Sequence, residues 1–137
     1  MLLNTKKTSS DTNCFSCYNV APIDTEEFKN KDFSKGCAIT EVSGLGLTRY
    51  GYYACGAGAS LDRVFGFDIG IKKLNEVTND KIKEQMKILC SFCGHFKYFS
   101  YDDPKKRSNW SFDEQISVSW ENAYAKYRKS KPELSLY

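Results

Sequence analysis

The chain has 137 residues, 41% hydrophobic and 15% aromatic, with 20 Lys and Arg against 17 Asp and Glu and a formal net charge of +3. This length fits one domain, and the hydrophobic content excludes a disordered chain. The small net charge argues against a dedicated nucleic-acid binder, and no run reaches the ~18–20 apolar residues that a membrane-spanning helix needs.

The N-terminal stretch MLLNTKKTSSDTN is polar and has no apolar core of the kind found in secretory signals. We expect residues 1–13 to form a flexible tail and residues 14–137 to form a single domain. We also expect a cytoplasmic protein, in which thiols stay reduced. The six cysteines then indicate metal or redox chemistry rather than three disulfide bridges.

Short elements are predicted in the first half of the chain. DTEEFKNKDF predicts a helix over residues 24–33, with Asp24 as its cap and Glu27 reaching back. GCAITEV predicts a strand over residues 36–42 because β-branched residues recur in it. TRYGYYACG, residues 48–56, predicts an aromatic extended segment, and GAGAS after it predicts a turn.

Alternation predicts another strand over residues 63–74, where Phe65, Phe67, Ile69 and Ile71 share one face. The glycines on the opposite face, Gly66 and Gly70, indicate bulges or a second backbone passing close. The composition of FKYFSY predicts a further strand over residues 96–101.

Two amphipathic helices are predicted in the second half. In residues 78–90, Ile82, Met86 and Leu89 share one face and Thr78 or Asn79 caps the start. Residues 119–131 predict a terminal helix that Pro132 ends, with the cations of its last turn suiting the helix dipole.

Two CxxC pairs carry the strongest chemical signal, and they comprise Cys14, Cys17, Cys90 and Cys93. A CxxC turn directs two sulfurs toward one point, and zinc prefers four such ligands in a tetrahedron. Gly94 after the second pair lets the chain turn back toward the sulfurs. The two pairs resemble the knuckles of zinc-ribbon and treble-clef modules, although the 73 positions from Cys17 to Cys90 exceed the spacing of compact fingers.

Several alternatives use the same residues. His95 can replace one cysteine, Cys37 or Cys55 can join one pair, and an iron–sulfur cluster can use the same four thiolates. The simplest alternative is that the four cysteines are buried thiols with only a packing role. That hypothesis explains one CxxC pair easily but explains the presence of two pairs poorly. The sequence predicts an α+β domain: a small antiparallel sheet, two or three helices and a structural four-cysteine zinc site.

A cysteine-dependent enzyme is a third functional class for this chain. Cys55 lies beside glycines whose N–H groups can form an oxyanion hole, and His95 is the only histidine available as a base. A Gly-rich turn explains the same residues more simply. An all-thiolate zinc site is closed, so the metal itself does not indicate catalysis.

Basic and aromatic residues gather in two patches that are candidates for partner binding. These residues are Lys105, Lys106, Arg107 and Trp110 in one patch, and Trp120, Tyr124, Tyr127, Arg128 and Lys129 in the other. Rings and cations suit docking on a protein, because aromatics and Arg dominate interface hot spots. They also suit nucleic acid, which zinc-ribbon modules as a class often bind. The weak net charge favours the protein partner.

Overall fold

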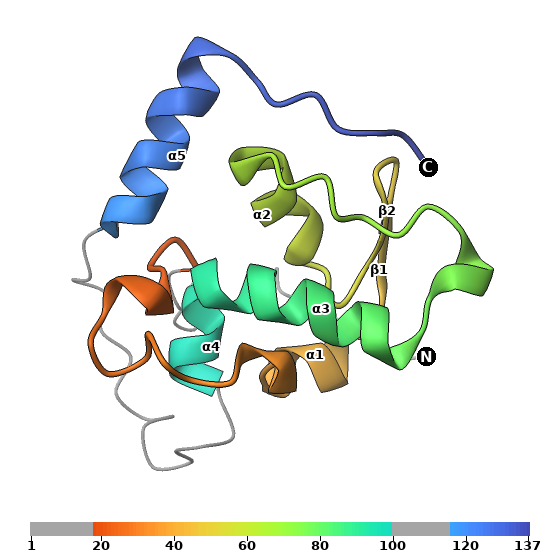
Figure 1. Cartoon of the computed structure of the whole chain (residues 1–137), viewed down its shortest axis with the longest axis horizontal. Helices are drawn as coiled ribbons and strands as arrows, with labels where there is room; N and C mark the ends of the chain where they lie inside the picture. The colour runs from red at the N-terminus through yellow and green to blue at the C-terminus, as the bar shows by residue number, and fades with distance from the viewer. Residues whose placement is uncertain (1–17, 100–115) are drawn as a thin grey trace, which may run out of the picture.

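A computed structural model describes residues 18–99 and 116–137 of the chain (Figure 1). This part is α+β, as the sequence predicts, but it holds five α-helices rather than two or three, and its sheet has only two strands. The elements in chain order are α1 (Ala38–Ser43), β1 (Gly46–Thr48), β2 (Gly51–Tyr53), α2 (Gly58–Phe65), α3 (Asn79–Leu89), α4 (Gly94–Phe99) and α5 (Val118–Lys129).

The sheet is a tight antiparallel hairpin. β1 pairs with β2 so that Gly46 faces Tyr53 and Thr48 faces Gly51, with a turn at residues 49–50. This places β2 inside the extended segment predicted for residues 48–56. A single bridge, between Tyr52 and Ile71, adds the chain after α2 to the edge of the hairpin.

The strand predicted over residues 63–74 is wrong for most of its length. Of GAGAS, residues 56–57 form the predicted turn, but the rest begins α2, which continues to Phe65. Gly66 ends this helix at φ +73°, a left-handed conformation that glycine adopts without strain. Beyond Gly66 the chain has no regular element before the bridge at Ile71, and Asp68 takes φ +53°. A Cβ at Gly70 would overlap the Tyr50 carbonyl oxygen, so the expected close passage of a second backbone is confirmed there.

Three other short elements were also predicted wrongly. The strand expected over residues 36–42 is helix α1, which ends where Gly44 takes φ +62°. The part of the strand expected over residues 96–101 that the structure describes lies in helix α4. The helix expected over residues 24–33 is a chain of turns between two 3-10 helices, Pro22–Asp24 and Phe33–Lys35.

The two long helices are confirmed. The Thr78 side chain caps α3 by accepting a hydrogen bond from the Lys81 N–H at 3.3 Å. α5 begins one residue earlier than predicted, with Ser117 at its N-cap position. Asp24, expected to cap a helix of its own, instead accepts bonds from the N–H and hydroxyl of Ser119 at 2.9 and 2.6 Å.

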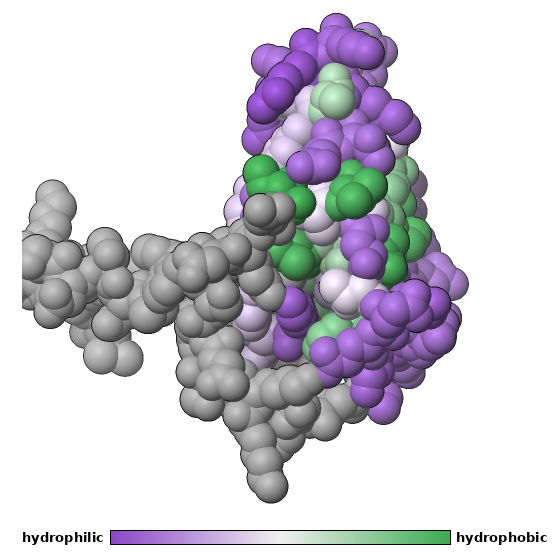
Figure 2. Space-filling model, turned by 90° about the vertical axis from the view of Figure 1, so that its left-hand side faces the viewer, coloured by the Kyte–Doolittle hydropathy of each residue, from purple (hydrophilic) through white to green (hydrophobic). Residues whose placement is uncertain are grey.

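Two hydrophobic clusters form the core on either side of the end of α3. One contains Ala21, Tyr53, Ala59, Leu61, Leu89, Cys93 and Trp120, and the other contains Phe28, Phe33, Cys90 and Phe96. The Cys90–Cys93 turn therefore has one thiol in each cluster. On the outside, Figure 2 shows mostly hydrophilic residues on the face that turns toward the viewer, with hydrophobic residues gathered across its middle.

The C-terminal segment after α5 runs back across the molecule toward the hairpin (Figure 1). The Tyr137 N–H donates to the Arg49 carbonyl at 2.8 Å. Asp68 accepts from the Ser135 N–H at 2.9 Å, and the hydrogen bond from the Ser135 hydroxyl is the main cause that lowers the pKa of Asp68. The segment is thus held by specific bonds at its end.

Candidate metal centre

The second CxxC pair lies at the junction of two helices. After α3 ends at Leu89, Cys90–Phe92 form one 3-10 turn, and the Cys93 N–H donates to the Cys90 carbonyl at 3.3 Å. α4 begins at the next residue, Gly94. Cys90 and Cys93 are both 7% exposed, so this turn places two thiols inside the protein.

The other two described cysteines lie on the same small cavity. It has a volume of about 20 Å³, enough for roughly one water molecule. Cys37, just ahead of α1, and Cys55, just after β2, line it together with Cys90, Cys93 and His95. Segments far apart in the sequence thus contribute four cysteines and a histidine to the lining of one cavity, and the CxxC spacing gave no signal for Cys37 and Cys55.

Burial favours the protonated form of three of these thiols, those of Cys37, Cys90 and Cys93, when no cation is near. It raises the pKa of Cys93 to about 12, and it raises the pKa of Cys90 further still, with the neighbouring Cys93 adding to the effect. Burial also raises the pKa of Cys37. A metal ion reverses this preference, because a coordinating thiol loses its proton.

The N-terminal side of the described chain lies directly against this turn. The Gly94 N–H donates to the Tyr18 carbonyl at 2.8 Å. The Tyr18 ring meets the Trp120 ring edge-on, with centroids 5.4 Å apart. The residue that follows the first CxxC pair is therefore bonded to the residue that follows the second.

Part of the predicted four-cysteine set cannot be compared with the structure. Cys14 and Cys17 lie outside the described residues, as do Lys105, Lys106, Arg107 and Trp110. Within residues 18–99 and 116–137, no three His, Cys, Asp or Glu side chains are arranged to hold a metal ion. The zinc site stays a prediction.

The basic and aromatic residues of α5 divide between core and surface. Trp120 is 0% exposed, and its Nε1–H donates to the Phe92 carbonyl at 2.6 Å, so its ring is a core ring. Tyr124 and Tyr127 are partly buried, and Arg128 and Lys129 are exposed. Of the α5 residues predicted to bind a partner, the tyrosines and the cations therefore reach the surface and Trp120 does not.

The geometry gives little room for catalysis by Cys55. Cys55 and His95 do line one cavity, as a cysteine–histidine pair requires. That cavity holds roughly one water molecule, however, and its other walls are mainly thiols and apolar side chains. The cavity itself therefore has no space for a substrate between Cys55 and His95.

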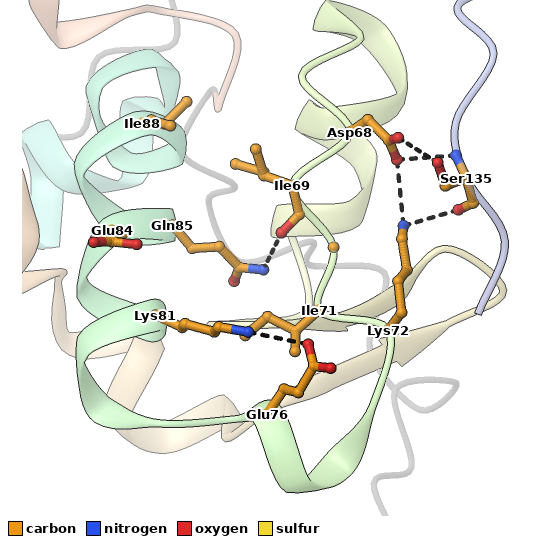
Figure 3. Close-up of a pocket in the computed structure, with 11 residues that line it drawn as sticks. Asp68, Ile69, Ile71, Lys72, Glu76, Lys81, Glu84, Gln85, Ile88 and Ser135 are labelled. Atoms are coloured by element: carbon orange, nitrogen blue, oxygen red, sulfur yellow. Dashed lines mark hydrogen bonds and ion pairs between the residues drawn. The ribbon is translucent and has the colours of Figure 1, made fainter.

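A larger hollow lies between α3 and the chain after α2 (Figure 3). Its charged groups bond to one another: Lys81 pairs with Glu76 at 3.0 Å, and Lys72 donates to the Ser135 carbonyl at 2.8 Å. Gln85 bonds to the Ile69 carbonyl at its inner wall. Most of the charged groups here are thus paired within the protein, while Glu84 lies exposed in the lining.

Comparison with protein-family models, with curated proteins and with solved structures finds no significant match. The described helices include none with the length and apolar character needed to cross a membrane. The class that the fold defines is a small α+β domain whose helices enclose a cysteine-lined cavity.

Proposed function

We propose that this protein is a small zinc-stabilised module that docks on a protein partner, with zinc bound by Cys14, Cys17, Cys90 and Cys93. The observation that carries the proposal is the hydrogen bond from the Gly94 N–H to the Tyr18 carbonyl. Cys17 precedes Tyr18 by one peptide unit, about 3.8 Å between Cα atoms. The chain therefore tethers the end of the first pair beside the second.

The environment of the second pair suits a structural metal. Cys90 and Cys93 are buried in two hydrophobic clusters, where neutral thiols act only as small apolar groups. A bound zinc ion would join those clusters to the N-terminal segment. Its binding free energy would add directly to folding, at about 10–16 kcal/mol for structural zinc in small domains.

A second ligand set shares the cavity. Cys37 and Cys55 line it together with Cys90 and Cys93, but no three of these described side chains are arranged to hold a metal ion, so this set would require them to move. Iron–sulfur clusters also take four thiolates, and ligand spacing does not separate them from zinc. One experiment can therefore determine both which metal is bound and which cysteines bind it.

That experiment is elemental analysis of the purified full chain and two paired variants. We expect about one zinc per wild-type chain. We expect Cys14→Ser with Cys17→Ser to lose it, because two of four ligands are removed. The matched control is Cys37→Ser with Cys55→Ser. It removes two thiols from the cavity that Cys90 and Cys93 also line, and it should retain the zinc.

The converse pattern, with metal lost only from the control, would assign the centre to Cys37, Cys55, Cys90 and Cys93. If the purified chain instead contains iron and absorbs visible light, the bound group is an iron–sulfur cluster and not zinc. Wild-type chain with no bound metal, and with a melting temperature that chelator does not change, would remove the metal centre altogether.

The docking half of the proposal rests on an apolar surface at the junction of α1 and β1. Val42, Leu45 and Leu47 are 81%, 50% and 56% exposed within six residues of chain. Exposed apolar groups that gather in this way are typical of surfaces that another protein covers. We propose a partner with an apolar groove for this α1–β1 surface.

A triple variant tests the docking surface. We expect Val42→Ser, Leu45→Ser and Leu47→Ser together to abolish capture of a defined partner that the wild type retains, because the apolar contact area is lost. The control is Glu41→Gln, an exposed change in the same segment. A partner captured equally by wild type, triple variant and control would contradict this surface.

The nucleic-acid alternative has less support. Its principal ring on α5, Trp120, is in the core and cannot stack on a base. The exposed cations Arg128 and Lys129 still suit phosphate contacts, which would make binding fall steeply with salt.

A further inference from the structure

A separate hollow of about 350 Å³ lies between the hairpin turn and α2. Thr48, Arg49 and Tyr50 line it from the hairpin, and Ser60 and Arg63 line it from α2. Among the described residues that form its wall there is no Asp or Glu. The hollow is therefore basic, although the chain as a whole is nearly neutral.

Both arginines lie close to the ring of Tyr50. The Arg49 Cζ lies 5.4 Å from the Tyr50 ring centroid, and the Arg63 Cζ lies 6.0 Å from it. Both distances are within the range of cation–π attraction. Tyr50 thus brings two positive groups to the wall of one hollow.

Among the described residues, neither guanidinium forms an ion pair with a carboxylate. The ion pairs found there include those of Glu26, Asp68 and Glu76, all with lysines. This contrasts with the hollow in Figure 3, where lysines and carboxylates bond to one another. The two arginines are exposed at one hollow with no carboxylate in its described wall, so both can bind an anion there.

The hydroxyls of the wall add further donors. Thr48 Oγ1 accepts from the Tyr50 N–H at 3.1 Å, so its own hydrogen is available to a ligand. The Ser60 side chain is exposed at the edge of the hollow. Guanidiniums and hydroxyls together supply more hydrogen-bond donors than the two oxygens of a carboxylate can accept.

We infer that this hollow binds the phosphate monoester group of a small phosphorylated ligand. A monoester carries close to two negative charges at pH 7, which matches two arginines, and Arg forks fit phosphate oxygens in pairs. The volume is within the range of small-molecule sites, about 300–1,000 Å³, so more than the phosphate enters. The inference does not depend on the metal centre.

The test is titration of the full chain with adenosine 5′-monophosphate, followed by amide chemical shifts, with adenosine as the probe that lacks phosphate. We expect saturable binding of the monophosphate only. Arg49→Gln and Arg63→Gln should each weaken it by about tenfold or more, since each removes charge-assisted hydrogen bonds. Arg63→Lys should weaken it too, because lysine keeps the charge but loses the fork.

The control is Lys83→Gln, which removes an exposed cation on α3 and should leave affinity unchanged. Binding should strengthen as pH rises through about 6, where the monoester takes its second charge. Equal binding of adenosine, or equal loss in Lys83→Gln, would overturn the inference. So would binding of a single-stranded oligonucleotide with no binding of the monophosphate.

Discussion

Trp120→Ala is expected to destabilise the protein by about 3–5 kcal/mol, the usual cost of removing a fully buried tryptophan. Trp120 attaches α5 to the rest of the molecule. Its ring lies edge-on to Phe65 at 4.8 Å and contacts Tyr18 and Tyr124 at 5.4 and 5.3 Å. Urea unfolding followed by far-UV circular dichroism measures the loss, and this readout does not depend on tryptophan fluorescence.

Two further variants separate packing from hydrogen bonding. Trp120→Phe keeps a ring but leaves the Phe92 carbonyl without its donor, for an expected cost of about 1–3 kcal/mol. Asn122→Ala changes an exposed residue of the same helix and should stay within about 0.5 kcal/mol of wild type. A loss below 1 kcal/mol for Trp120→Ala would show that α5 is not held by this residue.

The elements that sequence predicts well are those long enough to repeat a pattern. α3 and α5 each run for 11 or more residues, so their apolar faces recur and their caps can be recognised. α1 and α4 have six residues each. At that length, β-branched and aromatic residues indicate a strand as readily as a buried helix, and tertiary packing decides.

Asp24 shows how a correct local signal can have a distant partner. Its residue type and the chain after it are typical of a helix cap. The structure uses it as such an acceptor, but for Ser119, 95 positions further along the chain. A local sequence pattern cannot predict a partner so far along the chain, because the packing of α5 brings Ser119 to Asp24.

The candidate metal centre likewise has a part that the sequence predicts and a part that depends on the fold. Cys90, Cys93 and Gly94 form one local turn, and their sequence predicts that turn. Cys37 and Cys55 reach the same cavity because α1 packs on α4 and because Gln85 of α3 bonds to the chain at Tyr52 and Ala54, and spacing encodes neither contact. Arg49 and Arg63 also become neighbours only through the fold, on either side of the Tyr50 ring.

Gln85 is the polar residue on which we expect the fold to depend most. It is 3% exposed in the middle of α3. Its side-chain oxygen accepts from the Ala54 N–H at 2.9 Å, and its Nε2 donates to the Tyr52 and Ile69 carbonyls at 2.9 and 2.7 Å. One amide therefore joins α3 to β2, to the residue after it and to the chain after α2 (Figure 3).

Gln85→Ala should cost about 2–4 kcal/mol, because buried backbone groups lose their partners. Gln85→Glu should cost more at pH 7, since a carboxylate cannot donate to either carbonyl and its charge is buried. Burial would raise the pKa of the introduced carboxyl above its unfolded value of about 4.3. Below that value both states are protonated and the charge penalty is absent; it grows as pH rises through the folded pKa.

The pH dependence distinguishes this explanation from a simple packing defect. Unfolding of Gln85→Glu in urea should approach that of wild type as pH falls toward 4, whereas the deficit of Gln85→Ala should stay constant. Glu84→Gln, an exposed change at the neighbouring position, is the charge control and should shift stability by no more than about 0.5 kcal/mol. A Gln85→Glu deficit that does not change with pH would mean that the carboxyl turns out to solvent, and the hairpin is then held to α3 by its apolar contacts alone.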